Sequence, residues 1–408
     1  MKKLLALTVV VALFVSIPLV GVMGASKTKL SVWTFWKQSW IQPALDKFMA
    51  AHPDVEIEYQ QLSWSNGFDK IVTAIAAGKA PDVMELGSTW MAQFIENKTI
   101  VPIDISAIKD DYSGWEGATG PDKNVYGFPW FGATNVLYIN ADLAKQAGID
   151  KCPATWSELK AASEAIDALG PGVRGYSIKI GGRYTTWQKF MPFAWSNGAR
   201  VLNDDWTESL VASDRFVEAL EYYDSLKKSS LVGTQEEIRQ AFYLGRVGII
   251  FDGPGLNLKE NAPELDYFVC LLPKPDRPGT KSVGFAGADY IVVTSQSKQK
   301  ALATELAEDI SQGNLISNHI RTLLPFYKPD LKALMAKYPN DPELKVYVEQ
   351  MKNATSPAPH PRWVDLQEVL TEAIESTILG RGTAKDNLAK AKKEMDSIIA
   401  EYLKEQGK

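Results

Sequence analysis

The chain has 408 residues, which is too long for one ordinary hydrophobic core and fits two domains. Hydrophobic residues make up 45% and charged residues 23%, an ordinary composition for a soluble globular protein. The formal net charge is only -5, with basic residues interleaved among acidic ones, which excludes the basic surface of a nucleic-acid-binding protein.

The first 25 residues have the layout of a secretory signal peptide. Two lysines precede an apolar run over 4–20, and the small residues Gly24 and Ala25 mark an expected cleavage site. An uncleaved anchor is the alternative, because the apolar stretch over 4–23 could just span a bilayer. We expect an exported protein, periplasmic or otherwise extracytoplasmic, that is soluble after cleavage of residues 1–25.

Strand and helix patterns alternate along the remaining chain. Strands are expected at 30–35, 55–62, 82–86, 135–140, 175–180, 246–252, 267–273 and 289–295, with helices between several of them, including one at 156–168. This βαβ rhythm predicts the α/β class with mostly parallel sheets and enough strands for two lobes. At the C-terminus, Thr383 and Asp386 form a capping pattern before a long amphipathic helix.

Cys152 and Cys270 are the only cysteines. An exported chain could pair them, but they lie far apart in sequence, and a bridge requires Cα atoms within about 7 Å. Two small buried hydrophobic residues are an equally good interpretation, so the sequence leaves the pairing open.

The catalytic motifs expected of an enzyme this long are missing from the sequence. The three histidines have no second ligand at metal-binding spacing, and there is no G-x-S-x-G elbow, P-loop or C-x-x-C. The segment GPGLNL at 253–258 lacks the third glycine of a dinucleotide-binding loop. We therefore expect no cofactor, no metal and no enzymatic activity. A secreted glycoside hydrolase is the alternative, since it needs only two carboxylates and the chain has 49 acidic residues.

One segment carries a family resemblance. Residues 124–162, NVYGFPWFGATNVLYINADLAKQAGIDKCPATWSELKAA, resemble the signature region of the family 1 extracellular solute-binding proteins, the maltose-binding-protein-like sugar-binding components of ABC importers. Further matching segments follow the family's order: APDVMEL at 80–86, LGRVGIIFDGPG at 244–255 and LLPKP at 271–275. The resemblance covers essentially the whole mature chain.

The resemblance implies a two-lobed periplasmic-binding-protein fold with the ligand enclosed between the lobes. The N-terminal lobe would comprise 26–138 plus 282–325, and the C-terminal lobe 139–281 plus 326–408. It also implies a monomer that closes around a carbohydrate, an oligosaccharide by expectation, and delivers it to the transmembrane permease of an ABC import system. Sugar identity, chain length and linkage are not readable from the sequence.

Twelve tryptophans are the one compositional excess, and several follow strands where the fold would place the cleft. A pyranose ring has an apolar face and a rim of hydroxyls, so flat aromatic walls suit it. The aromatic residues expected to contact ligand are Phe35, Trp36, Trp64, Trp90, Trp130, Trp187 and Trp363. Core packing is the competing interpretation for each. Gly255 departs from the family pattern, in which an aromatic residue follows Gly-Pro.

Hydroxyl recognition is expected from Ser88, Thr89, Asp252 and Arg362. An ionised Asp252 could accept from two hydroxyls, and Arg362 could donate a planar fork. Helix capping is the alternative for the first two and an ion pair for the last two. The absence of a Lys/Arg cluster in these loops argues against a polyanionic ligand. Within transport, a glycerol phosphodiester or a polyamine is the alternative solute; basic side chains at the cleft would favour the first, and acids beside aromatic rings the second.

Overall fold

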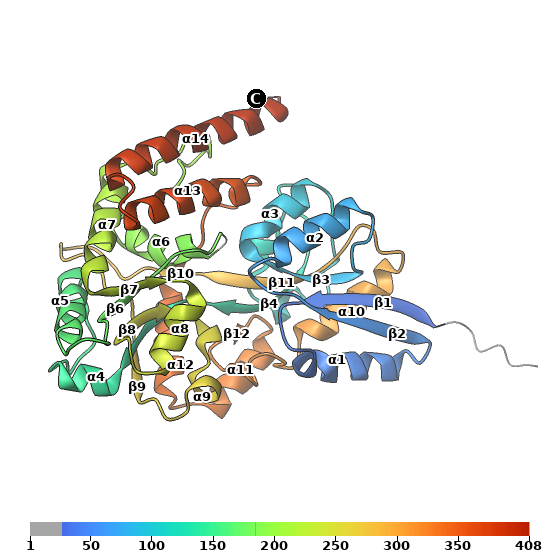
Figure 1. Cartoon of the computed structure of the whole chain (residues 1–408). Helices are drawn as coiled ribbons and strands as arrows, with labels where there is room; N and C mark the ends of the chain where they lie inside the picture. Colours follow the sequence, from blue (N-terminus) through green and yellow to red (C-terminus); the bar gives the residue numbers. More distant parts are fainter. Residues whose placement is uncertain (1–26, 184, 408) are drawn as a thin grey trace, which may run out of the picture.

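The computed structural model describes residues 27–183 and 185–407, so the expected signal segment lies outside the described residues. The chain forms two lobes that lie side by side, each built from a β-sheet and flanking helices (Figure 1). Among the described helices, none has both the length and the apolar content needed to cross a bilayer.

The first lobe contains a six-stranded sheet in the order β12-β4-β11-β3-β1-β2. Its strands are β1 (Thr28–Thr34), β2 (Val55–Gln61), β3 (Val83–Gly87), β4 (Phe128–Ala133), β11 (Gly287–Val293) and β12 (Leu324–Pro325). Its helices are α1 (Gln38–Ala51), α2 (Gly67–Ala76), α3 (Ser88–Glu96) and α10 (Lys300–Ser311). In Figure 1, α1 lies on one side of this sheet, and α2 and α3 lie on the other.

The strand directions in this sheet follow the route of the chain. β1 pairs in parallel with β2 and β3, as the alternation of strands and helices predicts. β11 pairs antiparallel with β3 and β4, and β12 pairs antiparallel with β4. The sheet is therefore mixed rather than mostly parallel, because β11 and β12 join it only after the chain has passed through the second lobe.

The second lobe has an antiparallel sheet in the order β8-β5-β9 and a parallel pair of β6 and β7. Its strands are β5 (Val136–Asn140), β6 (Tyr176–Lys179), β7 (Ser230–Gly233), β8 (Ile249–Asp252) and β9 (Tyr267–Cys270). The backbone N–H of Ile249 donates to the carbonyl of Gly175 at 2.9 Å, which places β8 beside β6.

Helices cover this second sheet on both sides (Figure 1). They are α4 (Ala141–Gln146), α5 (Trp156–Asp167), α6 (Thr186–Ser196), α7 (Asp214–Ser225), α8 (Gln235–Tyr243), α9 (Leu258–Asn261), α11 (Lys328–Lys337), α12 (Pro342–Lys352), α13 (Trp363–Ile378) and α14 (Ala384–Glu405). Short 3-10 turns lie at Lys109–Asp111, Trp115–Ala118, Leu226–Ser229 and Pro254–Leu256, and β10 (Gly284–Phe285) pairs with β13 (Ala354–Thr355).

Local sequence signals explain where several of these elements begin. Thr155 accepts a hydrogen bond from the N–H of Glu158, whose carboxylate accepts one back from the N–H of Thr155, a capping box that starts α5. The Thr383 hydroxyl accepts from the N–H of Asp386 at 3.1 Å, which confirms the predicted start of α14. Each strand predicted from the sequence is present, with ends shifted by a few residues.

Each lobe has its own hydrophobic core, and the two cores meet at the start of α13. Trp363 packs in the core of the second lobe, whereas the next residue, Val364, packs in the core of the first.

Cys152 and Cys270, whose pairing the sequence leaves open, form a disulfide with Cα atoms 5.6 Å apart within the second lobe. Disulfides persist in oxidising compartments, so this bond agrees with the expected export.

Candidate ligand-binding site

An aromatic cluster lies just beyond the carboxyl ends of β1, β2 and β3. The rings of Phe35 and Trp64 stack with centroids 3.9 Å apart and an interplanar angle of 11°. Trp90 lies 5.4 Å from Trp64 between ring centroids. Phe35 and Trp90 are buried, whereas 36% of Trp64 is exposed. Of the three predicted contact residues, Trp64 is therefore the one that offers a flat apolar surface to solvent.

Trp36 belongs to a second aromatic group beside this cluster. Its half-buried ring meets Phe131 edge-on, with centroids 5.4 Å apart. Trp130, which the sequence predicts as a contact residue, is instead buried beside Ser311 and Leu315 of the first lobe. Successive side chains of a strand point to opposite faces, so Phe131 rather than Trp130 is the β4 residue that reaches Trp36.

Ser88 and Thr89 form the first turn of α3, and both are half-buried. The hydroxyl oxygen of Ser88 accepts from the backbone N–H of Ala288 at 3.3 Å. The N-cap position belongs to Gly87, which has no side chain to cap with, so neither hydroxyl is a helix cap. Ser88 and Thr89 thus stand directly before Trp90 of the aromatic cluster. The alternative interpretation from the sequence, that they cap a helix, is wrong.

Trp187 and Trp363 face each other at the junction of the two lobes. Their rings form a T-shaped pair with centroids 5.1 Å apart, and Phe285 contacts Trp187 at 5.5 Å between ring centroids. Both tryptophans are almost completely buried. The sequence places them in separate loops of the cleft, whereas the structure shows one continuous aromatic contact between α6 and α13.

Several polar atoms around this tryptophan pair are buried and have no hydrogen-bond partner among the described residues. They are Nε1 of Trp187, Nε1 of Trp363, Nε2 of Gln367 and Oγ1 of Thr371. The last three residues are spaced four apart along α13 and share one helix face. Buried polar groups are almost always hydrogen-bonded, and each unsatisfied one costs about 1–3 kcal/mol. A molecule rich in oxygen acceptors would satisfy this row.

Arg362 lies at the rim of a pocket of about 370 Å³ that both lobes line. Its Nε donates to the carboxylate of Asp365 at 2.6 Å. The pocket is formed by α3 (Gln93, Glu96 and Asn97), by Pro361 and Arg362, and by the end of α14 (Tyr402, Glu405 and Gln406). Nε2 of Gln406 donates to Glu96 at 2.9 Å and links the C-terminal helix to the first lobe.

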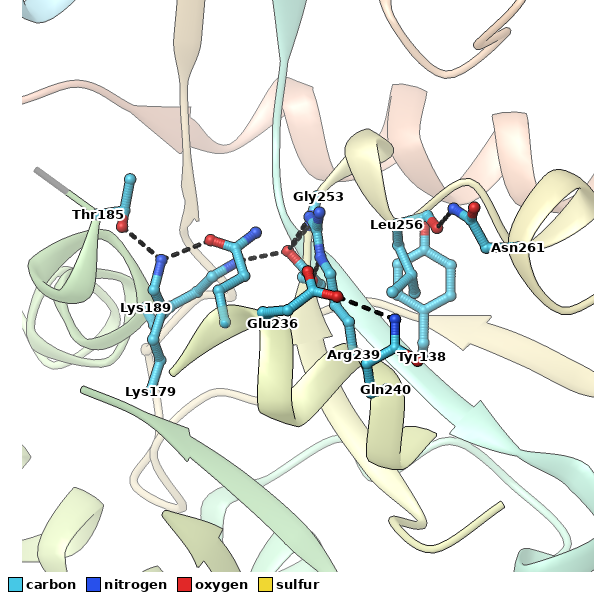
Figure 2. A network of polar contacts seen from close by, with 12 residues as sticks. Tyr138, Lys179, Thr185, Lys189, Glu236, Arg239, Gln240, Gly253, Leu256 and Asn261 are labelled. Atoms are coloured by element: carbon cyan, nitrogen blue, oxygen red, sulfur yellow. Dashed lines mark hydrogen bonds and ion pairs between the residues drawn. The ribbon is translucent and has the colours of Figure 1, made fainter. Parts of the chain in front are cut away.

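The carboxylate of Asp252 is already saturated by protein donors. Its oxygens accept from Nζ of Lys189 at 2.8 Å and from Nε of Arg239 at 2.7 Å, and the N–H of Gly253 adds a third bond. Lys189 comes from α6 and Arg239 from α8, and both are labelled near Gly253 in Figure 2. Burial opposes ionisation, but the two positive charges outweigh it and hold the pKa of Asp252 far below its usual value. Asp252 therefore organises the second lobe and has little capacity left for ligand hydroxyls.

Lys179 lies next to this ion-pair group. Its Nζ donates to Oε1 of Gln235 at 2.5 Å and to the hydroxyl of Thr185 (Figure 2). Within the described residues no carboxylate pairs directly with it. Burial, followed by the charge of Lys189, lowers its pKa to about 7. No sequence pattern predicts this group, because its basic residues come from three separate elements.

The comparisons with known proteins identify the family. Residues 36–308 match the bacterial extracellular solute-binding proteins. This chain belongs to that family. It is 27% identical over 367 residues to a protein of Brucella abortus described as a binding protein, covering 86% of this chain and 88% of the relative. It is 24% identical over 403 residues to the sn-glycerol-3-phosphate-binding periplasmic protein UgpB of Shigella dysenteriae, covering 88% of this chain and 89% of that relative.

A solved structure shows the same fold. The Listeria monocytogenes ABC substrate-binding protein Lmo0181, in complex with cycloalternan, superposes with a TM-score of 0.81 at 21% identity. The alignment covers 92% of this chain and 99% of the Listeria chain. The two-lobed periplasmic-binding-protein fold expected from the sequence is thereby confirmed.

Sequence reasoning missed four polar residues, two in central strands of the first lobe of this solute-binding protein and two at the junction of the lobes. Glu85 and Asp289 are buried in β3 and β11 of the first lobe, and Gln367 and Thr371 lie on the inner face of α13. A signal was present, because a carboxylate inside an otherwise apolar strand and polar residues on a buried helix face both break the hydrophobic pattern.

Proposed function

We propose that this chain is the sugar-binding component of an ABC importer and encloses an oligosaccharide between its two lobes. The observation that carries this proposal is the row of buried, unpartnered donors beside the Trp187–Trp363 pair. Hydroxyl and ring oxygens of a saccharide are acceptors for these N–H groups, and its apolar ring faces fit the aromatic surfaces. Trp36, Trp64, Ser88, Thr89 and Arg362 contribute further contacts from the sides of the site.

Lobe closure follows from the way the lobes already touch. Arg183 of the second lobe bridges to Asp69 of α2 at 3.3 Å, and Lys37 bridges to Glu260 at 3.0 Å. All four side chains are largely exposed, and exposed ion pairs contribute little to stability. Ligand contacts made by both lobes at once therefore shift the population towards the closed form.

The chain acts outside the cytoplasm, after removal of residues 1–25, as a monomer that docks on a membrane permease. The apolar leader and the Cys152–Cys270 disulfide support export. The hinge would divide the chain into 26–138 plus 282–325 and 139–281 plus 326–408. Enzymatic activity has no place in this role, because the ligand is released intact to the permease.

A phosphate-bearing solute is the second candidate, and Lys179 is the observation that favours it. The pocket beside Lys179, Lys189 and Asp252 measures only about 10 Å³, however. That volume is about the room needed by one water molecule and is too small for a phosphate group. The geometry therefore favours an uncharged or amine-bearing saccharide over a phosphodiester.

The first test is a thermal-shift panel of mono- and oligosaccharides with glycerol phosphodiesters and polyamines included. A sugar at about 100 times its Kd adds roughly 2.7 kcal/mol to the free energy of unfolding, which raises the melting midpoint by several degrees. The same mixtures are analysed for cleavage products. A rise in melting midpoint with sugars, without cleavage products, supports the proposal. No rise with any sugar would contradict it, and formation of cleavage products would favour the glycoside hydrolase.

A variant test addresses the donor row directly. Trp363→Phe keeps an aromatic ring but removes the unpartnered Nε1–H, so we expect sugar affinity to fall by about tenfold or more, with a small loss of stability because the buried ring is smaller. Trp156→Phe is the matched control, because Nε1 of Trp156 is also buried and unpartnered but its ring stacks on Tyr222, away from the junction. Equal affinities for the two variants would contradict the assigned site.

A further inference from the structure

Two buried carboxyl groups lie side by side beneath the aromatic cluster of the first lobe. In the ladder between β3 and β11, Glu85 stands opposite Ile291 and Gly87 stands opposite Asp289. Residues two apart in a strand share a face, so the side chains of Glu85 and Asp289 are diagonal neighbours on the same side of the sheet. Both residues are at least nine-tenths buried.

The two carboxyl groups differ in how their oxygens are used. Glu85 accepts from the backbone N–H of Phe35 at 2.8 Å and from Nε1 of Trp36 at 3.0 Å. Oδ1 of Asp289 is buried and accepts no hydrogen bond from any described residue. Among the described residues, no basic side chain balances the charge of these two carboxyl groups. Burial raises the pKa of Glu85 to about 8. Burial and the nearby charge of Glu85 raise the pKa of Asp289 well above its usual value.

Gly87, which has no side chain, adjoins both the free oxygen of Asp289 and the ring of Trp64. A Cβ atom on Gly87 would lie 3.8 Å from Oδ1 of Asp289 and 3.4 Å from the edge of the Trp64 ring. Asp289 and Trp64 therefore border the same bare stretch of β3. Trp64 is the most exposed member of the aromatic cluster, so one border of this stretch lies at the protein surface.

A protonated amine is the group that this surrounding fits best. Without a cation, burial keeps both carboxyl groups in their neutral form, and a sugar hydroxyl adds no charge that would favour their ionisation. An ammonium supplies three donors and a positive charge that stabilises the ionised form of the carboxyl groups. Two carboxyl groups without a basic partner, beside exposed tryptophan, are thus complementary to a cation.

We propose that Glu85 and Asp289, together with Trp64, form a subsite for a protonated amine, so that the ligand of this protein is an amine-bearing saccharide. The inference rests on the proposed carbohydrate-binding function and narrows its substrate class. It also fixes orientation: the amine faces the first lobe, and the acceptor-rich edge of the sugar faces the donor row of the second.

The test compares three β-1,4-linked disaccharides that differ only at C2: chitobiose with free amines, N,N′-diacetylchitobiose with amides, and cellobiose with hydroxyls. Affinities are measured by titration calorimetry at about pH 6, below the pKa of such amines. We expect chitobiose to bind about tenfold tighter or more than the other two. Asp289→Asn should lower the affinity for chitobiose to about that for cellobiose.

Two further variants test whether the amine preference depends on this carboxyl pair. Glu85→Gln should weaken the amine preference by itself and provides a second route if Asp289→Asn fails to fold. Asp54→Asn, an exposed acid in the same lobe, is the matched control and should leave the preference intact. Salt should weaken chitobiose binding more than cellobiose binding, because only the first includes an ion pair.

The outcomes separate this inference from the proposed function. Equal affinities, or binding of neutral sugars alone, overturn the amine subsite while leaving carbohydrate binding in place. If no sugar of either panel binds but spermidine does, and Asp289→Asn weakens it, the carbohydrate function fails and the cation subsite stands. If neither sugars nor spermidine bind, both proposals are overturned.

Discussion

Replacing Asp252 with asparagine should strongly destabilise the second lobe. Asp252→Asn keeps the side-chain shape but removes the negative charge that pairs directly with the buried Lys189 and with Arg239. Breaking a buried ion pair by removing one partner costs about 3–5 kcal/mol, because the remaining charge stays buried. For a unit of roughly 150–250 residues, this corresponds to a fall in melting midpoint of roughly 6–20 °C.

The pH dependence of this loss has a definite sign. The pKa of Asp252 is depressed in the folded state, so its stabilisation is present at pH values above the unfolded pKa. It is lost only as the pH falls through the folded pKa. The difference in unfolding free energy between the parent protein and Asp252→Asn should therefore be constant above about pH 5 and shrink below about pH 4.

Calorimetry and urea denaturation between pH 3 and 8 measure both effects. Glu58→Gln is the matched control, because the Lys29–Glu58 pair is exposed on both sides and should contribute nothing measurable. If Asp252→Asn unfolds at the same midpoint as this control, or loses less than about 1 kcal/mol, the carboxylate does not organise the lobe as argued.

Three further predictions follow from buried and covalent groups. The pKa of Lys179 is lowered to about 7, so the free energy of unfolding should rise with pH from about 7 towards 10. Lys179→Met should remove this rise and be more stable than the parent protein at pH 6, as measured by urea denaturation. The pKa of Glu85 is raised to about 8, so stability should fall as pH rises from about 5 to 8, and Glu85→Gln should show a shallower fall in the same assay; an unchanged slope would refute the assignment. The Cys152–Cys270 disulfide closes a loop with a sequence separation of 118, so its reduction should lower the free energy of unfolding by about 2–5 kcal/mol. A variant with both cysteines replaced by serine should be as stable as the reduced protein, and a reductant should not change its stability.

Local sequence patterns were sufficient to predict the secondary-structure elements and the protein family. Hydrophobic alternation located β2, a short apolar run located β5, and the Thr383–Asp386 pair marked the start of α14, because these signals depend only on neighbouring residues. Motifs in a fixed order identified the solute-binding family and its two-lobed fold. Aromatic enrichment in the loops also predicted which residue types would gather near the cleft.

The roles of individual side chains were decided only by the tertiary structure. Strand alternation turned Phe131 rather than Trp130 towards Trp36, although both rings are buried. Long-range contacts filled the oxygens of Asp252 with donors from two helices, and sheet register brought Glu85 beside Asp289. The physical reason is the same in each case: charge compensation and side-chain direction depend on neighbours that are distant in sequence, and those neighbours are set by strand pairing and lobe docking rather than by local propensity.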